Sequence, residues 1–280
     1  MSENDQLMTV KITFVGGGNM ACAMLGGLIK TAQSTNQFCV VEPMPLQRQY
    51  IEQTFAVKTL APEQPIPASD VIVLAVKPQQ MQAVVQNMRD SCQEWIANTL
   101  VISIAAGVLT ENLSAWLSGH KRIIRAMPNT PALIGMGIAG LASPYPQTSG
   151  DQTLALAILQ SVGTAIWFDS ELDLDSVTAL SGSGPAYVFR FLEIMQASGV
   201  QMGLDAQTAR QLAIETFSGA AQLAKQSPLP LSTLREQVTS KGGTTAAALD
   251  SMNAQHLDEI FTRALFAAKL RAAELAQSQR

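Results

Sequence analysis

A short apolar run that ends in three glycines constrains the fold of this chain more than any other feature. Val10, Ile12 and Phe14 alternate with other residues as in a β-strand, and the run stops at Gly16-Gly17-Gly18. A helical pattern of apolar residues begins directly afterwards, at Met20. This order of strand, glycine turn and helix is typical of the first unit of a dinucleotide-binding sheet.

The spacing of the glycines indicates which ligand such a turn would bind. Gly16, Gly18 and Ala21 match the pattern G-x-G-x-x-G/A, in which glycines allow a tight turn and a close approach of the backbone to a pyrophosphate. The following helix offers unpaired N–H groups and the positive end of its dipole to phosphate. The alternative is a tight turn without a ligand. We expect a bound NAD(H) or NADP(H), with contacts from Gly16, Gly18, Asn19 and Met20.

Strand and helix signals alternate over the first 168 residues. Strands are expected at residues 38–41, 71–76, 100–104, 122–126 and 164–168, and helices at residues 46–54, 80–88 and 110–117. This alternation predicts an α/β fold with a doubly wound parallel sheet, whose ligands bind outside the carboxyl ends of the strands. Further cofactor contacts are therefore expected after three strands, from Ala75, Val76, Lys77, Ala105, Ala106, Gly107, Pro128 and Asn129.

From residue 169 onward the strand signal disappears and helices rich in small residues follow. Helical periodicity covers residues 185–200, 205–225, 231–238, 246–252 and 256–277. We predict a dinucleotide-binding Rossmann domain at residues 8–168 and a helical substrate-binding and dimerisation domain at residues 169–280. The helices are rich in alanine and poor in charge, which favours close helix–helix contact and a dimer interface. The alternative is a self-contained helical bundle.

Composition excludes several classes of partner. With 47% hydrophobic residues, 14% charged residues and a net charge of −4, the chain has no basic face for a nucleic acid. Residues 1–6 are polar, unlike a secretory signal, and no apolar run approaches the ~18 residues that span a bilayer. Cys22, Cys39 and Cys92 lack Cys-x-x-Cys spacing, which disfavours disulfides and a zinc site. We expect a cytoplasmic protein with no membrane, nucleic-acid or metal partner.

The chain contains few side chains suited to nucleophilic or acid–base catalysis. Its two histidines, His120 and His256, lie beside no second histidine and no suitable carboxylate, which disfavours a hydrolase or a metalloenzyme. Hydride transfer suits such a chain, because the nicotinamide supplies the difficult chemistry and the protein supplies position. A protonated imine is a better acceptor here than a carbonyl, which would normally need a strong proton donor.

A second glycine-rich segment, residues 238–245, precedes a helical pattern in the C-terminal half. Glycines before a helix form an anion site, and the hydroxyls of Ser240, Thr244 and Thr245 flank this one. A small carboxylate would fit such a site. The alternative is that Gly242 and Gly243 merely link two helices and that Thr244 is an ordinary N-cap.

Six motifs in this order resemble pyrroline-5-carboxylate reductase, and the resemblance covers nearly the whole chain from Met8. They are Gly16-Gly-Gly-Asn-Met20, Ala75-Val-Lys-Pro78, Ser103-Ile-Ala-Ala-Gly107, Arg125-Ala-Met-Pro-Asn-Thr-Pro131, Ser181-Gly-Ser-Gly-Pro-Ala-Tyr187 and Ser240-Lys-Gly-Gly-Thr-Thr245. The resemblance implies reduction of 1-pyrroline-5-carboxylate to L-proline with NAD(P)H, the last step of proline biosynthesis. It also implies a homodimer with interlocking helices, and related enzymes assemble such dimers into decamers.

The same resemblance implies roles for individual residues. Ser240, Gly243 and Thr244 would bind the substrate carboxylate, and Thr245 would also contact the substrate, as the catalytic residue at the ring nitrogen. Pro128 and Asn129 would lie beside the nicotinamide.

The chain departs from the family at Glu42 and Lys241. A carboxylate at the end of the second strand pairs with the ribose of NAD and repels the 2′-phosphate of NADP. The family often has a small or hydroxyl residue at this position, and Arg48 could serve a phosphate, so Glu42 is expected at the cofactor without deciding between NADH and NADPH. Lys241 replaces a usual proline.

Two other functions remain open from the residues alone. A β-hydroxyacid dehydrogenase shares this domain plan but needs a helix-borne catalytic lysine, and no Gly-x-x-x-Lys helix lies at a suitable place. A non-catalytic NAD(P) sensor would bind the dinucleotide without turnover.

Overall fold

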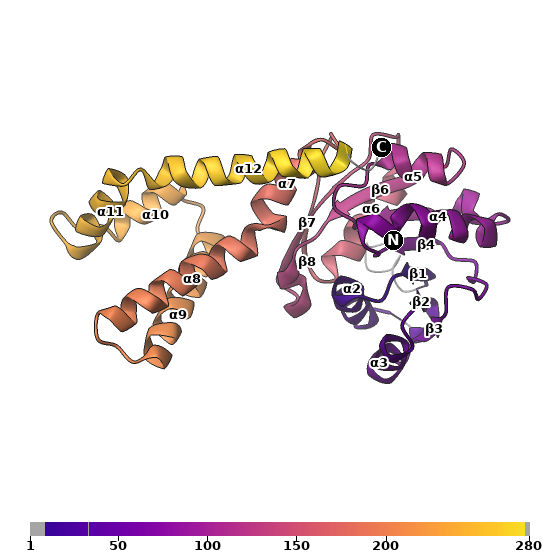
Figure 1. Cartoon of the computed structure of the whole chain (residues 1–280), viewed down its shortest axis with the longest axis horizontal. Coiled ribbons are helices and arrows are strands. Elements are labelled where there is room, and N and C mark those ends of the chain that lie inside the picture. Colours follow the sequence, from indigo (N-terminus) through magenta and orange to yellow (C-terminus); the bar gives the residue numbers. More distant parts are fainter. Residues whose placement is uncertain (1–8, 33, 278–280) are drawn as a thin grey trace. The chain divides into compact units, whose positions relative to one another are not determined.

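The computed structural model describes residues 9–32 and 34–277 (Figure 1). Met8 and residues 278–280, which the domain prediction includes, lie outside the described residues, as does the polar stretch 1–6. The described chain forms two compact units. The first consists of the residues up to Ser183 together with the stretch from Ala268 onward, and the second consists of Gly184–Ala267. The predicted functional division after residue 168 stays a prediction.

The first unit is built on an eight-stranded sheet in the order β3-β2-β1-β4-β5-β6-β7-β8. The strands are β1 (Ile12–Val15), β2 (Phe38–Val41), β3 (Lys58–Leu60), β4 (Val71–Leu74), β5 (Leu100–Ser103), β6 (Ile123–Met127), β7 (Gly137–Ala142) and β8 (Gly163–Trp167). The strand order reverses between β1 and β4, which is the switch point where a doubly wound sheet binds its ligand. The predicted α/β fold is confirmed.

The two faces of the sheet are covered by separate groups of helices. Alternate residues of β4 point to opposite faces, so Val71 and Val73 join one core cluster while Ile72 and Leu74 join the other. Each fully buried side chain of this kind contributes about 1.5–3 kcal/mol. The helices of this unit are α2 (Asn19–Ile29), α3 (Pro45–Phe55), α4 (Pro78–Cys92), α5 (Thr110–Trp116), α6 (Ser149–Gln160) and α7 (Asp173–Val177).

The structure adds elements that the sequence pattern does not predict. β7 runs antiparallel to β6, whereas the other strand pairings among the described residues are parallel. Its sequence, GIAGLA, is dominated by small residues and carries a weak strand signal. α6 and the three-residue β3 are also new, and α7 continues into a π-helical turn at Thr178–Gly182.

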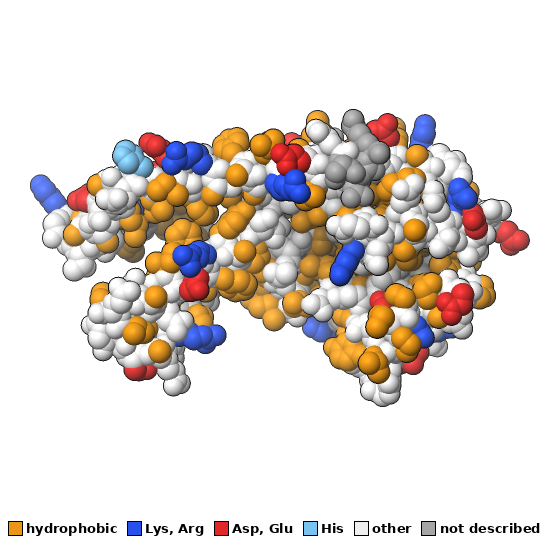
Figure 2. Space-filling view, in the orientation of Figure 1, with side chains coloured by type: hydrophobic (Ala, Val, Ile, Leu, Met, Phe, Trp, Pro, Cys, Tyr) orange, Lys and Arg blue, Asp and Glu red, His pale blue; other side chains and the backbone are white. Residues whose placement is uncertain are grey.

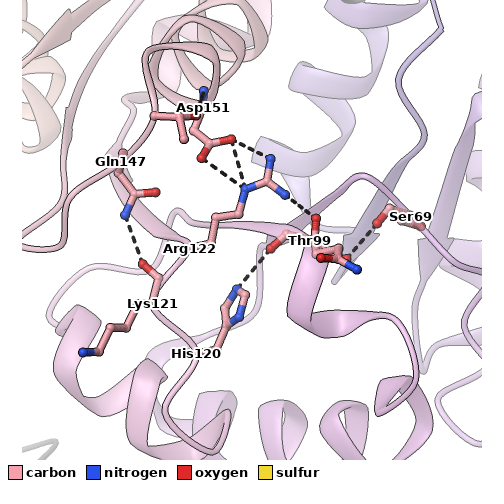
Figure 3. A network of polar contacts seen from close by, with 9 residues as sticks. Ser69, Thr99, His120, Lys121, Arg122, Gln147 and Asp151 are labelled. Atoms are coloured by element: carbon pink, nitrogen blue, oxygen red, sulfur yellow. Dashed lines mark hydrogen bonds and ion pairs between the residues drawn. The ribbon is translucent and has the colours of Figure 1, made fainter.

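A polar network (Figure 3) includes Ser69, Thr99 and Arg122, which lie just before β4, β5 and β6. It therefore lies at the amino-terminal ends of these parallel strands, whereas the glycine turn follows the carboxyl end of β1. Arg122 binds the carboxylate of Asp151 with Nη2 at 2.6 Å and Nε at 3.0 Å from Oδ1. The Thr99 carbonyl lies 3.0 Å from Nε2 of His120, and the Thr99 hydroxyl donates to the carbonyl of Ser69. The network thus lies at the end of the strands away from the predicted ligand site.

The second unit is helical, as predicted. It contains α8 (Gly184–Gln201), α9 (Ala206–Gln226), α10 (Leu231–Gln237), α11 (Thr244–Ala254) and the first part of α12 (Leu257–Gln277). Asp205 caps α9 by accepting the N–H groups of Gln207 and Thr208. Phe191 stacks on Phe217 and also contacts Phe261, which links three helices.

Large apolar side chains remain on the surface of the helical unit. Phe189 is 65% exposed and Leu223 is 67% exposed, and α8 has a single buried residue, Gly199. Figure 2 shows apolar side chains along the visible face of these helices. A helical surface of this kind is typical of an interface with another chain. No helix among the described residues is long and apolar enough to cross a membrane.

Candidate active site

Gly16 is required by the fold itself. Its φ of +101° lies in the region that favours glycine, and its N–H donates to the carbonyl of Val41 at 2.8 Å. A Cβ on Gly16 would lie 2.6 Å from the carbonyl oxygen of Ala75 and 2.9 Å from Cγ1 of Val76. The structure therefore brings the predicted residues Gly16, Ala75 and Val76 together at the switch point of the sheet.

Gly18 has no such reason to be glycine. Its φ of −72° suits any residue, and a Cβ built on it would meet nothing within 4 Å. Gly18 is the N-cap of α2, and no side chain caps this helix end. The exposed Asn19 and the half-buried Met20 are its first helical residues. This open helix N-terminus fits a pyrophosphate, which needs free N–H groups and close access to the backbone.

Side chains from the second βα segment hold the middle glycine of the turn. Oε2 of Glu42 accepts the N–H of Gly17 at 2.8 Å, and Oε1 accepts the N–H of Met44 at 2.9 Å. Nε2 of Gln47 donates to the carbonyl of Gly17 at 2.6 Å. Sequence reasoning selects Glu42 but misses Gly17 and Gln47, because the motif gives no role to its middle glycine.

The other predicted cofactor residues follow neighbouring strands. Lys77 is exposed and is the N-cap of α4. Ala105 is buried and Ala106 half-buried. Gly107 has a φ of +74°, and a Cβ there would lie 3.2 Å from Cβ of Leu275. The last turns of α12 thus pack on the loop between β5 and α5, and both segments belong to the first unit. The cofactor roles of these residues stay predictions.

Asn129 holds two segments together. It is buried next to Pro128, its Nδ2 donates to the carbonyl of Ser181 at 3.0 Å, and its Oδ1 accepts the N–H of Ile138 at 3.0 Å. The amide is therefore occupied by the π-helical turn on one side and by β7 on the other. Its predicted place beside the nicotinamide stays a prediction.

A buried ion pair involves β6, the strand that ends just before Pro128 and Asn129, and this pair is not predicted from the sequence. Nη1 of Arg125 lies 2.8 Å from Oε1 of Glu171, with side-chain exposures of 6% and 12%. Both oxygens of Glu171 also accept from Thr110, one from its N–H at 2.9 Å and one from its hydroxyl at 2.7 Å. The carboxylate is thus satisfied, as a buried charge must be.

The second glycine segment folds as a tight turn before α11. The N–H of Gly243 donates to the carbonyl of Ser240 at 3.0 Å, and Gly242 has a φ of +71°. This combination, with a negative φ at Lys241, is a type II turn. A Cβ on Gly243 would collide with the Ser240 hydroxyl, so glycine is needed where the loop closes.

The N-terminus of α11 has no side-chain cap. Gly243, and not Thr244, is the N-cap, and no acidic residue lies in the first turn. Ser240 and Thr244 are exposed and Thr245 is half-buried. Backbone N–H groups at a helix N-terminus, flanked by hydroxyls, are suited to binding an anion, and the predicted anion site at this turn stays a prediction. Among residues 9–32 and 34–277, no group of three or more His, Cys, Asp and Glu side chains could hold a metal ion.

Two family models match separate parts of the chain. Residues 11–107 match a family described as NADP oxidoreductase, coenzyme F420-dependent. Residues 171–275 match the pyrroline-5-carboxylate reductase dimerisation family. These matches support a nucleotide-binding first part and an oligomerising helical part.

Similar proteins match over nearly their full lengths. A pyrroline-5-carboxylate reductase of Haemophilus influenzae is 41% identical over 94% of this chain and 97% of its own length. The structure of a pyrroline-5-carboxylate reductase from Coxiella burnetii has a TM-score of 0.89 and 39% identity, over 96% of this chain and 99% of that one. The structure of a Plasmodium falciparum pyrroline carboxylate reductase with NADP bound has a TM-score of 0.82 and 28% identity, with the same coverage.

Proposed function

The chain belongs to the pyrroline-5-carboxylate reductase family, and from this premise we propose that it reduces 1-pyrroline-5-carboxylate to L-proline, the last step of proline biosynthesis. It is an NAD(P)-dependent oxidoreductase that acts on a C=N bond. The observation that carries the proposal is that α2 and α11 both begin at a glycine N-cap without a side-chain cap. The reaction needs two anion sites, one for a pyrophosphate and one for a carboxylate.

The first unit fits a dinucleotide. The space beside Gly18 is empty, since a Cβ there would meet no atom within 4 Å, so the fold itself does not require glycine at this position. The N-terminus of α2 offers its N–H groups at the same point. We assign the pyrophosphate to Gly16, Gly18, Asn19 and Met20, and the rest of the dinucleotide to Glu42, Ala75, Val76, Lys77, Ala105, Ala106, Gly107, Pro128 and Asn129. When bound, the nicotinamide supplies the hydride.

The second unit fits a small carboxylate. We assign the substrate carboxylate to Ser240, Gly243 and Thr244, where the turn holds the Ser240 hydroxyl beside the start of α11. The N–H groups of a helix N-terminus bind an anion without any need for a charged side chain.

Thr245 is proposed to act on the imine itself. It lies in the first turn of α11, one residue beyond Thr244, and is half-buried. A hydroxyl can both donate and accept, so Thr245 can hydrogen-bond the ring nitrogen as the C=N bond becomes a C–N bond. A protonated imine already carries its proton, so Thr245 needs only to orient the nitrogen, and no strong acid is required.

The chain is a homo-oligomer, because its helical part matches a dimerisation family. We propose a dimer as the minimal unit and a decamer as a further assembly. Exposed Phe189, Leu223 and Phe266 support the dimer, since a second copy would cover them. Light scattering on the purified chain distinguishes a monomer, a dimer and a decamer.

We place the enzyme in the cytoplasm, with neither a membrane nor a nucleic acid as a partner. Cys22, Cys39 and Cys92 are free thiols, and Cys39 and Cys92 are buried. Free thiols are typical of a reducing compartment.

The test follows the oxidation of NADH or NADPH by absorbance in the presence of 1-pyrroline-5-carboxylate. We expect oxidation that depends on the imine, with proline as the product. A 3-hydroxy acid with the oxidised cofactor serves as the control for a dehydrogenase. Dinucleotide binding without any imine-dependent oxidation would instead identify a sensor and overturn the proposal.

A further inference from the structure

The carboxylate of Glu42 is fixed at the carboxyl end of β2. Its oxygens accept the N–H groups of Gly17 and Met44 at 2.8 and 2.9 Å, and the residue is 8% exposed. Gly17 belongs to the turn that faces the dinucleotide, so one hydrogen bond ties the carboxylate to that turn. The carboxylate cannot rotate away without leaving the buried backbone N–H of Gly17 unpaired, which is unfavourable.

A carboxylate at this place meets the adenosine ribose of the dinucleotide. Two carboxylate oxygens together offer about four acceptor positions, and the backbone N–H groups use two of them. The others suit ribose hydroxyls, which are donors. A 2′-phosphate offers no donor when ionised and places a second negative charge beside Glu42.

The neighbouring cation is held against the backbone. Nη1 of Arg48 donates to the carbonyls of Glu42 and Pro43 at 2.7 and 2.9 Å. Within residues 9–32 and 34–277, neither Glu42 nor Arg48 takes part in an ion pair. The guanidinium is thus anchored on the strand end by Nη1, and among the described residues no basic side chain lies within ion-pair distance of the Glu42 carboxylate.

We propose, on the basis of the proposed function, that Glu42 makes NADH rather than NADPH the preferred hydride donor of this enzyme. Glu42 does this by accepting from the ribose hydroxyls and by repelling a 2′-phosphate. The same carboxylate also positions the glycine turn through its hydrogen bond with Gly17. It therefore both selects the cofactor and holds the turn that binds it.

The first test titrates the full-length wild-type oligomer with NADH and with NADPH and follows the fluorescence of the reduced nicotinamide. We expect NADH to bind about 10-fold or more tightly than NADPH, because like charges held in contact oppose binding. The melting temperature should rise more with NADH than with NADPH at equal concentration. Equal affinity, or tighter binding of NADPH, overturns the inference.

Two variants separate the charge of Glu42 from its hold on the turn. Glu42→Thr removes the charge and should reduce the ratio of NADPH to NADH dissociation constants at least ~5-fold, since the repulsion is gone. Gln47→Ala is the matched control, because it releases the Gly17 carbonyl but keeps the charge. It should weaken both dinucleotides alike and leave the ratio unchanged. A ratio that moves equally in both variants would assign the preference to turn geometry and overturn the role of the charge.

Failure of this inference differs from failure of the proposed function. If the enzyme reduces 1-pyrroline-5-carboxylate equally well with both donors, the function stands and the preference is wrong. If NADH binds tightly and no imine is reduced, the preference stands and the function is wrong.

Discussion

Asn129 and Ser181, far apart in the sequence, are joined by a hydrogen bond from Nδ2 of Asn129 to the Ser181 carbonyl, 3.0 Å away. The same amide accepts the N–H of Ile138 through Oδ1. Asn129 is 8% exposed, so these bonds are shielded from water. The side chain therefore fixes the π-helical turn at Thr178–Gly182 against the sheet.

Replacing Asn129 by aspartate should make the unfolding free energy depend on pH, because one of the two hydrogen bonds of its side chain needs a donor. Asn129→Asp keeps the acceptor for Ile138 but turns a carboxylate oxygen toward the Ser181 carbonyl, which should lower the unfolding free energy by about 1–3 kcal/mol at neutral pH. At acidic pH the protonated carboxyl can donate to Ser181, and stability should approach that of the wild type measured at the same pH. Urea unfolding at several pH values measures this. Asn129→Ala, the control, should stay destabilised at every pH.

Gly16 and Gly18 should respond in opposite ways to the same substitution. Gly16→Ala strains a φ of +101° and meets the Ala75 carbonyl, so it should lower the unfolding free energy by ~1–3 kcal/mol or more. Gly18→Ala has open space and an ordinary φ, so it should melt like the wild type yet lose dinucleotide affinity at least ~10-fold, because the Cβ occupies the approach of the pyrophosphate. The bulkier Gly18→Val should lose more. Melting curves and fluorescence titrations test this pair, and unchanged affinity in a folded Gly18→Ala variant would contradict the assignment.

Local patterns explain what the sequence could predict. The all-apolar β4 and the glycine turn are recognised from neighbouring residues alone, and so are helix starts such as Gly184-Pro185 and Asp205. Each of these signals reflects a backbone preference or a burial pattern within a few positions. The fold class follows from their order along the chain.

Contacts between distant residues explain what the sequence could not predict. The bond from Gly17 to Glu42 spans 25 residues and that from Asn129 to Ser181 spans 52, and no local pattern encodes either. β7 is stabilised by its neighbours in the sheet rather than by its own small residues. Within the candidate site, residue types could be selected from motifs, whereas the Glu42–Gly17 and Asn129–Ser181 hydrogen bonds required the structure.

The ion pair of Asp151 with Arg122 should make stability depend on pH. Burial alone would raise the pKa of the Asp151 carboxyl, but the hydrogen bonds from Arg122 and at Thr148 outweigh it and hold the pKa below its usual value. A lowered folded pKa stabilises the protein above the unfolded pKa of about 3.9, and this contribution is lost as the pH falls through the folded pKa.

Asp151→Asn should therefore lower the unfolding free energy by roughly 1–3 kcal/mol at pH 7, the scale of a hydrogen bond to a charged group. The difference from the wild type should shrink as the pH falls below about 4, because the unfolded chain binds the proton first and the folded carboxyl follows only at its lower pKa. Chemical denaturation across this range measures both. A difference that stays constant with pH would mean that Asp151 acts through packing alone.

Thr245→Ala should affect turnover more than substrate binding. The hydroxyl is assigned to the reacting nitrogen, where it can donate to the lone pair that forms as the hydride adds to the carbon, so kcat should drop about 10- to 100-fold with a smaller change in KM. Thr245→Ser keeps the hydroxyl and should recover much of the rate. Steady-state kinetics with saturating cofactor provide the measurement, and wild-type kcat in Thr245→Ala would remove the residue from the mechanism.

Lys241 occupies the second position of the type II turn that precedes α11. Gly242 takes the positive φ of this turn, and the Gly243 N–H closes it onto Ser240. Proline is common at the second position because its fixed φ of about −65° matches the turn. Lys241→Pro should therefore be accepted without strain and should stabilise the chain by about 0.4–1 kcal/mol, through a less flexible unfolded state.

The same position tests whether the lysine charge attracts the substrate. Lys241 is exposed, so a charge effect should be screened by salt. If the charge steers the carboxylate, Lys241→Gln should raise the KM for 1-pyrroline-5-carboxylate at low ionic strength, and the difference should close in about 0.5 M salt. If stiffness of the loop matters instead, Lys241→Gln should be silent while Lys241→Pro lowers KM by preorganising the turn. Because Pro removes the charge and stiffens the turn, whereas Gln only removes the charge, comparing the two at both ionic strengths separates electrostatic attraction from preorganisation.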